Sequence, residues 1–308
     1  MLDRKFLREN RDQVVRAVAL KRESVDIQAY YDQDAARRAA LQEIETLQAE
    51  ANRANRAISD VKKAGGDASA AIAEMKSVSD RLKQLKDSAV ELEAAVEQLY
   101  LRIPNLPHAS VPEGGEECNV VVRTWGEVTQ PAHAMVPHWD LAAELGIFHP
   151  ERAVRMSGSG FTVLSGQGAR LERALINWFL DVHLEQGYTE FNIPYLVNAE
   201  AMQGTGQLPK LAEDMYHCQV DDLYLIPTAE VSVTNVHMQE TLDAAQLPLK
   251  YCAFSPCFRR EAGAAGKDTR GLLRVHQFHK VEMVKFVAPD TSWDELELLT
   301  ADAEELLQ

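Results

Sequence analysis

Residues 250–287 read KYCAFSPCFRREAGAAGKDTRGLLRVHQFHKVEMVKFV, and this stretch decides how the second half of the chain folds. Its apolar ends predict two strands, residues 251–258 and residues 272–287, joined by a charged loop. Side chains alternate along the second strand, so that Phe278 and Glu282 share one face. A loop so charged between apolar strands indicates a ligand.

Arg259 stands where the first of these strands ends. We expect Arg259, Phe278 and Glu282 to converge on one surface of the sheet. A guanidinium suits a carboxylate or a phosphate because its fixed fork of donors matches two oxygens, and it stays charged at any working pH. A flat aromatic ring beside the guanidinium suits stacking with a nucleotide base. The sequence shows no convincing Ser/His/Asp or Cys/His arrangement, which favours chemistry based on positioning and cationic stabilisation.

The composition is typical of a globular protein of about two domains. The 308 residues include 32 basic and 47 acidic side chains, and the net charge is −15. A diffuse basic field that holds nucleic acid is therefore excluded, and any contact with RNA has to be local. The chain has neither the apolar core of a signal peptide nor a run apolar enough to cross a bilayer, so we expect a cytoplasmic protein.

The four cysteines are too few for a disulfide scaffold and lack the paired spacing of a zinc site. They are Cys118, Cys218, Cys252 and Cys257. We interpret them as reduced and structural, and a metal site that combines Cys257 with His276 and His279 is the alternative. The glycines at 158, 160, 166 and 168 do not continue into a phosphate-binding loop, so we interpret them as turn residues.

A helical hairpin is predicted over residues 28–103. Apolar residues recur there at alternating steps of three and four, the spacing of a heptad seam, on both sides of a glycine pair at 65 and 66. The first seam is Ala40, Ile44, Leu47, Ala51, Ala54, Ile58 and Val61, and the second is Met75, Val78, Leu82, Leu85, Ala89, Leu92, Val96, Leu99 and Ile103. Two seams that flank a glycine pair predict antiparallel helices packed on each other.

This hairpin is expected to project on the order of 50 Å, since each helix has roughly 35 residues at about 1.5 Å per residue. Its outer part, residues 51–87, carries eight basic side chains, which are Arg53, Arg56, Lys62, Lys63, Lys76, Arg81, Lys83 and Lys86. Only five acidic side chains lie in the same stretch, so its local charge is +3. The excess by itself is also compatible with the solvated surface of an ordinary coiled coil.

Turn-forming residues follow the hairpin, with Pro104, Pro107 and a glycine pair at 114 and 115. This change of composition marks a linker, with a domain boundary near residue 108. An amphipathic helix is then predicted over residues 171–186, followed by an extended segment at 189–197 that contains a proline. Taken alone, this helix and strand are typical of an ordinary core.

Together these features resemble class II aminoacyl-tRNA synthetases, and among them the seryl-tRNA synthetase family. Residues 258–263, 268–278 and 280–282 match the family's second signature motif, and the likeness extends over the chain. The helix and strand within residues 171–197 are similar to the first motif, which builds the homodimer interface. The hairpin lies where the family has a coiled-coil arm, which grips the long variable arm of its tRNA through backbone shape.

The resemblance implies the roles of individual residues. Arg259 is the implied catalytic residue, because it would bridge the substrate carboxylate and the α-phosphate of ATP. The implied ATP-binding residues are Arg259, Arg260, Glu261, Val275 and Phe278, with Phe278 stacked on the adenine. The implied serine-binding residues are Thr228, Ala229, Glu230 and Glu282, with Glu282 accepting a hydrogen bond from the serine hydroxyl. Alanine has no hydroxyl, so its binding would leave this acceptor without a hydrogen bond and would be weaker.

The implied fold is α+β, with an N-terminal antiparallel coiled-coil arm that binds tRNA (residues 1–108) and an incomplete class II antiparallel-sheet catalytic domain (residues 109–308). The implied reaction activates L-serine with ATP and transfers it to tRNA(Ser), an expectation that extends to tRNA(Sec). The implied cofactors are ATP and Mg²⁺, with the magnesium ion on phosphate oxygens and no metal site made of protein groups alone. The eight basic residues of the outer arm are the implied tRNA contacts, and a homodimer without membrane contact is the implied assembly.

Two features depart from the family's pattern. Gly160 precedes Phe161 where the family usually has an arginine. The family's third motif, a glycine-rich strand and helix with an ATP-binding arginine, does not occur before Gln308, so we expect a truncated chain that is weakly active or inactive alone. Two alternatives stay open at this point. One is a non-catalytic relative that binds ligands, and the other is an amino-acid:carrier-protein ligase, whose members usually lack a long arm and use zinc.

Overall fold

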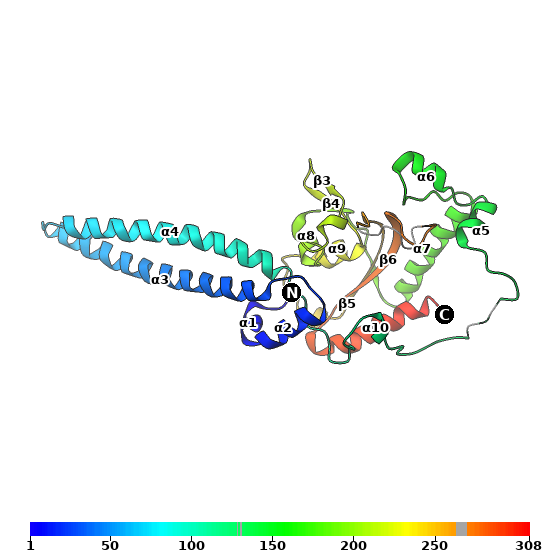
Figure 1. Cartoon of the computed structure of the whole chain (residues 1–308), viewed down its shortest axis with the longest axis horizontal. Helices are drawn as coiled ribbons and strands as arrows, with labels where there is room; N and C mark the ends of the chain where they lie inside the picture. The colour runs from blue at the N-terminus through cyan, green and yellow to red at the C-terminus, as the bar shows by residue number, and fades with distance from the viewer. Residues whose placement is uncertain (128, 130, 263–269) are drawn as a thin grey trace. The chain divides into compact units, whose positions relative to one another are not determined.

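The protein is described by a computed structural model (Figure 1) that covers residues 1–127, 129, 131–262 and 270–308. It divides into two compact units, Met1–Gly126 and Glu127–Gln308. Helices dominate the first unit and the second mixes helices with two small sheets, which confirms the predicted α+β class. Among the helices described, none has the length and apolar character needed to span a bilayer.

The elements follow one another in a simple order. The first unit contains α1 (Arg4–Glu9), α2 (Arg11–Leu20), α3 (Ile27–Lys63), α4 (Ser69–Tyr100) and the 3-10 helix η1 (Glu116–Cys118). The helices of the second unit are α5 (His138–Glu144), α6 (Pro150–Ser157), α7 (Gln167–Glu185), α8 (Ala199–Gly204), α9 (Ala229–Thr234) and α10 (Ser292–Glu305). Its strands are β1 (Thr189–Glu190), β2 (Leu196–Val197), β3 (His217–Cys218), β4 (Leu223–Leu225), β5 (Leu249–Phe258) and β6 (Gln277–Phe286). Short 3-10 turns complete it, namely η2 (Ala212–Asp214), η3 (Asn235–His237), η4 (Ala244–Gln246) and η5 (Pro289–Thr291).

The arm predicted from the two heptad seams is confirmed, because α3 and α4 lie side by side along their length (Figure 1). Every residue of the second seam is at least partly buried, and in the first seam only Val61, next to the tip, is exposed. The turn between the helices uses Gly65 at φ +74°, a conformation that glycine adopts without strain. All eight basic side chains of the outer arm are exposed.

The root of the arm is held by apolar packing and by charge pairing. Its core consists of Leu7, Val14, Tyr30, Val96 and Ile103, contributed by α1 to α4 and the turn after α4. Asp34 is buried and lies 3.1 to 3.7 Å from three guanidinium groups, those of Arg8, Arg37 and Arg38. Glu93 pairs with Arg4 and Arg37, and the hydrogen bond from Arg4 is the main cause of the lowered pKa of Glu93. These contacts fix the root independently of the outer arm.

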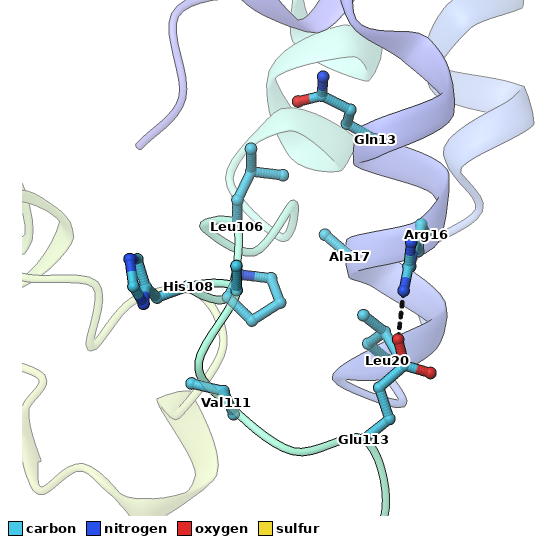
Figure 2. A pocket seen from close by; sticks show the side chains of 10 residues that line it. Gln13, Arg16, Ala17, Leu20, Leu106, His108, Val111 and Glu113 are labelled. Atoms are coloured by element: carbon cyan, nitrogen blue, oxygen red, sulfur yellow. Dashed lines mark hydrogen bonds and ion pairs between the residues drawn. The ribbon is translucent and has the colours of Figure 1, made fainter.

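A cavity of about 300 Å³ lies between α2 and the segment that follows the arm (Figure 2). Gln13, Arg16 and Leu20 line it from the helix, and Leu106 and Val111 line it from the segment. Arg16 forms an ion pair with Glu113 across its edge, as the dashed line in Figure 2 shows. The segment after residue 108 therefore packs on the first unit, and a functional boundary near residue 108 stays a prediction.

The hairpin predicted from the sequence is confirmed as β5 and β6, which pair antiparallel from Leu249 opposite Phe286 to Phe258 opposite Gln277. The expected start of the second strand at residue 272 is wrong. Residues 271–274 turn instead, with Gly271 at φ +81° and the Leu272 N–H donating to His138 Nε2 at 2.8 Å.

The extended segment predicted at residues 189–197 is divided between two sheets. β1 pairs in parallel with β5, which gives the order β1-β5-β6, whereas β2 belongs to an antiparallel sheet of order β2-β4-β3. Pro194 lies between the two strands and has no N–H to donate to a ladder. The preceding helix begins at Gln167, four residues before the predicted start, and ends at Glu185.

The two faces of the hairpin are covered by different helices. α7 and α10 pack on one face around Leu180, Tyr188 and Cys252. α9 packs on the other face, where β5 presents the small buried side chains Ala253, Ser255 and Cys257. These lie opposite the residues Glu282, Lys280 and Phe278 of β6. Because the β5 side chains are small, the start of α9 approaches the strands closely.

On the face that packs against α10, Lys285 is almost completely buried between two carboxylates. Its Nζ lies 3.2 Å from Glu295 and 3.3 Å from Asp302, and the Tyr188 hydroxyl donates to Asp302 at 2.6 Å. Burial would raise the pKa of Asp302, but the hydrogen bonds from Tyr188 and Lys285 outweigh it, and that pKa is lowered. The cluster fastens α10 to the sheet.

Lys285→Met is expected to lower the free energy of unfolding of the second unit by about 3 kcal/mol, because it leaves two acidic groups without their buried cation. Urea denaturation followed by tryptophan fluorescence measures this. Since the folded pKa of Asp302 is lowered, its stabilisation is present above the ordinary value of 3.8 and is lost as the pH falls through the folded value. Equal stability of Lys285→Met and the unchanged protein would show that the cluster does not fasten α10.

Candidate active site

Arg259 and Phe278 lie in contact at the open end of the hairpin. The Arg259 N–H donates to the carbonyl oxygen of His276 at 2.9 Å, which extends the ladder one step beyond Phe258. Since side chains alternate along a strand, Arg259 shares a face with Cys257. Phe278 lies opposite Cys257 on β6 and belongs to the same face. The guanidinium carbon lies 4.9 Å from the centre of the Phe278 ring, and Nε donates to the Pro227 carbonyl oxygen at 3.4 Å.

Glu282 is two strand positions further along the same face, within a hydrogen-bonded cluster. The Thr228 hydroxyl, at the start of α9, donates to Glu282 Oε2 at 2.6 Å. It accepts hydrogen bonds from Lys280 Nζ at 2.8 Å and from the Glu230 N–H at 3.2 Å. Lys280 also forms an ion pair with Glu282 Oε2. These contacts therefore bring the predicted serine-binding residues Thr228 and Glu230 together with Glu282.

Glu230 lies beside this cluster and has a raised pKa. Its burial is the main cause, the nearby charge of Glu282 is the second, and the charge of Lys280 acts in the opposite direction. Two carboxylates thus share one ammonium group on this side of the pocket. A cationic ligand that binds between them would relieve their repulsion.

Two adjoining cavities meet at Arg259. The first, of about 370 Å³, is lined by Gln207, Leu211, Asp214, Met215, Pro227, Thr228, Glu230, Arg259, Glu261, Arg274 and Lys280. The second, of about 490 Å³, is lined by Arg259, Glu261, Leu272, Leu273, Arg274, Val275 and Phe278. The residues common to both are Arg259, Glu261 and Arg274. One ligand that extended across both cavities would therefore pass two guanidinium groups at the junction, with carboxylates at one end and an aromatic ring at the other.

Most residues predicted to bind a ligand lie at these cavities, and three do not line them. Glu282 lines neither cavity itself, but it contacts Thr228 and Lys280, which line the first one. Arg260 is exposed and lines neither, although its N–H donates to the Asp214 carbonyl oxygen at 2.8 Å. Ala229 is completely buried, so only its backbone is available. Glu261, at φ +52°, turns back and pairs with Arg274 at 2.5 Å. Gly263, one end of the matched motif, lies outside the described residues.

Lys280, Arg274 and Asp214 line the first cavity, but no individual role was predicted for them from the sequence. A role for Lys280 could have been predicted, because the alternation that places Phe278 and Glu282 on one face places Lys280 between them. Asp214 gave no such signal, since its contacts depend on a backbone path through the loop before β3. Its Oδ1 accepts from the Ala262 N–H at 2.7 Å and thereby fixes the chain after Arg259.

Gly160 supports the hairpin through its backbone. Its carbonyl oxygen accepts a hydrogen bond from the His276 N–H at 2.7 Å, and its φ is +79°. A Cβ atom added there would lie 2.4 Å from the His276 ring, so a larger residue requires a rearrangement. The alternative metal site fails on geometry, because His276 and His279 are three positions apart on opposite sides of the chain and His279 Nδ1 contacts Glu172 at 2.8 Å.

Known families match both units of the chain. Residues 1–107 match the description "Seryl-tRNA synthetase N-terminal domain", and residues 216–308 match "tRNA synthetase class II core domain (G, H, P, S and T)". A serine–tRNA ligase from Gemmatimonas aurantiaca is 51% identical over 274 residues, which are 89% of this chain and 64% of that protein. A serine–tRNA ligase from Geobacter sulfurreducens is 49% identical over 310 residues, and the match covers 100% of this chain and 73% of that protein.

Two solved structures are also similar. One is a seryl-tRNA synthetase from Pyrococcus horikoshii complexed with ATP, with a TM-score of 0.88 and 34% identity over 100% of this chain and 74% of the other. The second is a cytoplasmic serine–tRNA ligase from Naegleria fowleri in complex with AMP, with a TM-score of 0.79 and 25% identity over 98% of this chain and 70% of the other. The chain thus spans about two thirds to three quarters of the length of these relatives.

Proposed function

Because the chain belongs to the seryl-tRNA synthetase family, we propose that it acts as a serine–tRNA ligase, activating L-serine with ATP and transferring it to tRNA(Ser). The observation that carries this proposal is the position of Arg259 where two cavities meet. The cavity with Thr228 and Glu230 receives serine. The cavity with Val275 and Phe278 receives the adenosine of ATP.

The chemistry follows from this arrangement. An oxygen of the serine carboxylate attacks the α-phosphorus of ATP, and pyrophosphate leaves. Two anions are forced together in that step, so a guanidinium that binds both lowers the barrier by positioning and by charge. Arg259 provides such a group, held in place by Phe278 and by the Pro227 carbonyl oxygen.

Serine is oriented by groups of opposite character. Its ammonium group pairs with Glu230, whose raised pKa reflects burial and the nearby charge of Glu282. Its hydroxyl donates to Glu282, whose contacts with described residues are both made by Oε2. A site that reads a hydroxyl rejects the analogue without it far better than an apolar pocket could.

Magnesium would enter with ATP and neutralise charge on the phosphate oxygens. Glu261 lines both cavities and pairs with Arg274, and its carboxylate would supply an oxygen ligand for an ion beside the phosphates.

The arm supplies the grip on tRNA. Its exposed basic side chains lie on α3 and α4, where Arg81 also contacts Glu43 and Lys86 contacts Gln48 of the other helix. Contacts of this kind follow the phosphate backbone, so tRNA(Sec) with a similar long arm would bind as well. We place the reaction in the cytoplasm, where tRNA is charged.

A homodimer through α7 is part of the proposal. Leu171, Leu175 and Trp178 are exposed on this helix, at the spacing of one helical face. This is the helix that resembles the family's first motif. Its apolar face is suited to pair with a second copy of the chain.

ATP–pyrophosphate exchange with purified protein tests the proposal. Exchange that depends on serine, and that alanine and threonine do not support, is the expected result. Binding of serine and ATP without any exchange would instead favour a non-catalytic relative, and the aminoacylation of tRNA(Ser) then decides whether the arm serves charging.

Phe278→Ala is expected to raise the KM for ATP by about 10- to 100-fold, since base–aromatic stacking contributes roughly 1–3 kcal/mol. The KM for serine should change much less, because Phe278 lines only the second cavity. Exchange kinetics with each substrate varied in turn measure both constants. An unchanged KM for ATP would show that the adenine does not stack on Phe278.

A further inference from the structure

Lys280 stands between the two groups that the proposed function assigns to serine. Its Nζ donates to Thr228 Oγ1 at 2.8 Å and forms an ion pair with Glu282 Oε2. The side chain is 33% exposed and lines the first cavity. Lys280 belongs to the matched motif, but no individual role was predicted for it.

These contacts determine the direction of a hydrogen bond. A hydroxyl has one proton to donate and two lone pairs that accept. Lys280 and the Glu230 N–H both donate to the Thr228 oxygen, so its acceptors are used and its own proton points to Glu282 Oε2. Oε2 then has two donors, and we assign Oε1 to the substrate.

The charge of Lys280 matters as much as its hydrogen bond. The charged groups around Glu282 are Glu230 from α9, Lys280 from β6 and Arg259 after β5, with the Cys257 thiol on the neighbouring strand. The other charged residues that line the first cavity are Asp214, Glu261 and Arg274, and the last two pair with each other. Among the described residues, Lys280 is the cation that forms an ion pair with Glu282.

Resting on the proposed function, we infer that Lys280 is a positioning residue that sets the selectivity for serine. By fixing the Thr228 hydroxyl and pairing with Glu282 Oε2, it leaves Glu282 Oε1 to accept a hydrogen bond from the substrate hydroxyl. Without Lys280 the Thr228 hydroxyl and Glu282 would lose this fixed arrangement, and the site would discriminate less well against an amino acid without a hydroxyl. Lys280 therefore separates serine from alanine without touching the reacting atoms.

The strand offers a matched control. Lys285 lies on the opposite face of β6, where it pairs with Glu295 and Asp302. Lys280→Met and Lys285→Met remove the same ammonium group from the same strand. The first is expected to change selectivity, and the second is expected to change stability alone.

Calorimetric titration of the protein with non-hydrolysable seryl- and alanyl-adenylate analogues tests the inference without requiring turnover. Lys280→Met is expected to reduce the affinity ratio of the two analogues by about 10- to 100-fold, the factor for one hydrogen bond to a charged group. The pH below which seryl-analogue binding weakens should rise, because the nearby charge of Lys280 lowers the pKa of Glu230 and the variant lacks that charge. Lys280→Arg keeps the charge and should keep the original pH dependence.

The outcomes separate the inference from the function on which it rests. An unchanged protein that binds neither analogue overturns both. An unchanged protein that discriminates, together with a Lys280→Met variant that discriminates equally well, overturns the inference alone. The inference is also overturned if Lys280→Arg shifts the pH dependence as far as Lys280→Met does, or if Lys285→Met reduces the affinity ratio equally.

Discussion

Arg259→Ala is expected to lower serine-dependent ATP–pyrophosphate exchange by about 1,000-fold or more. The guanidinium lies at the junction of the two cavities, where the attacking carboxylate and the α-phosphate have to meet. Alanine would remove both the charge and the fork of donors that holds these groups in line. Exchange kinetics at saturating ATP and serine measure the loss.

Arg259→Lys separates charge from geometry. Lysine keeps the positive charge but cannot bind two oxygens with a rigid fork, so we expect an activity well below that of the unchanged protein. Arg155→Ala, which removes an exposed guanidinium from α6, serves as the control and should keep full activity. Thermal unfolding confirms that each variant is folded. Full exchange by a folded Arg259→Ala protein would show that this residue does not bridge the substrates.

Removal of the outer arm is expected to abolish charging of tRNA(Ser) while serine-dependent exchange stays within about twofold, since the two activities depend on separate units. The change deletes residues 44–86 and joins the helices with a short Gly-Ser turn. It takes away all eight exposed basic side chains but leaves the root core and the ion pairs of Asp34 and Glu93 in place. Aminoacylation and exchange are measured on the same preparation.

A second arm variant distinguishes charge from shape. Replacing the eight basic residues with Gln keeps the helices and should lower kcat/KM for tRNA by about 100-fold or more at low salt, with a weaker dependence on salt, because contacts with phosphate are lost. The affected residues are Arg53, Arg56, Lys62, Lys63, Lys76, Arg81, Lys83 and Lys86. Normal charging by the protein with the shortened arm would assign the arm another role.

The sequence was most informative where a pattern repeats. The arm follows from two seams spaced at three and four residues, because only packing against a second helix uses such a stripe. The hairpin follows from strict alternation along β6, and the same alternation brings Phe278 and Glu282 to one face. Periodicity therefore predicted both the longest feature of the first unit and the frame of the site.

The remaining site residues depend on contacts that no local pattern encodes. Arg260 was grouped with Arg259 from the motif, yet neighbouring side chains on an extended chain point to opposite sides, and Arg260 is exposed. Asp214 reaches the site through a loop whose course depends on the whole second unit. Lys280 belongs to the matched motif, but its hydrogen bond to Thr228 depends on how α9 packs on the sheet. The predicted start of β6 was too early because residues 271–274 form a turn before the strand. His138, which is distant in sequence, stabilises this turn.

A crystal structure of the protein with a bound non-hydrolysable seryl-adenylate analogue tests the central claim most directly. The account predicts that the adenine stacks on Phe278, that the phosphate mimic and the seryl carbonyl contact the Arg259 guanidinium, and that the serine hydroxyl lies within hydrogen-bonding distance of Glu282 Oε1. A ligand whose adenine occupies the cavity of Thr228 and Glu230, or whose phosphate mimic lies away from Arg259, would contradict it.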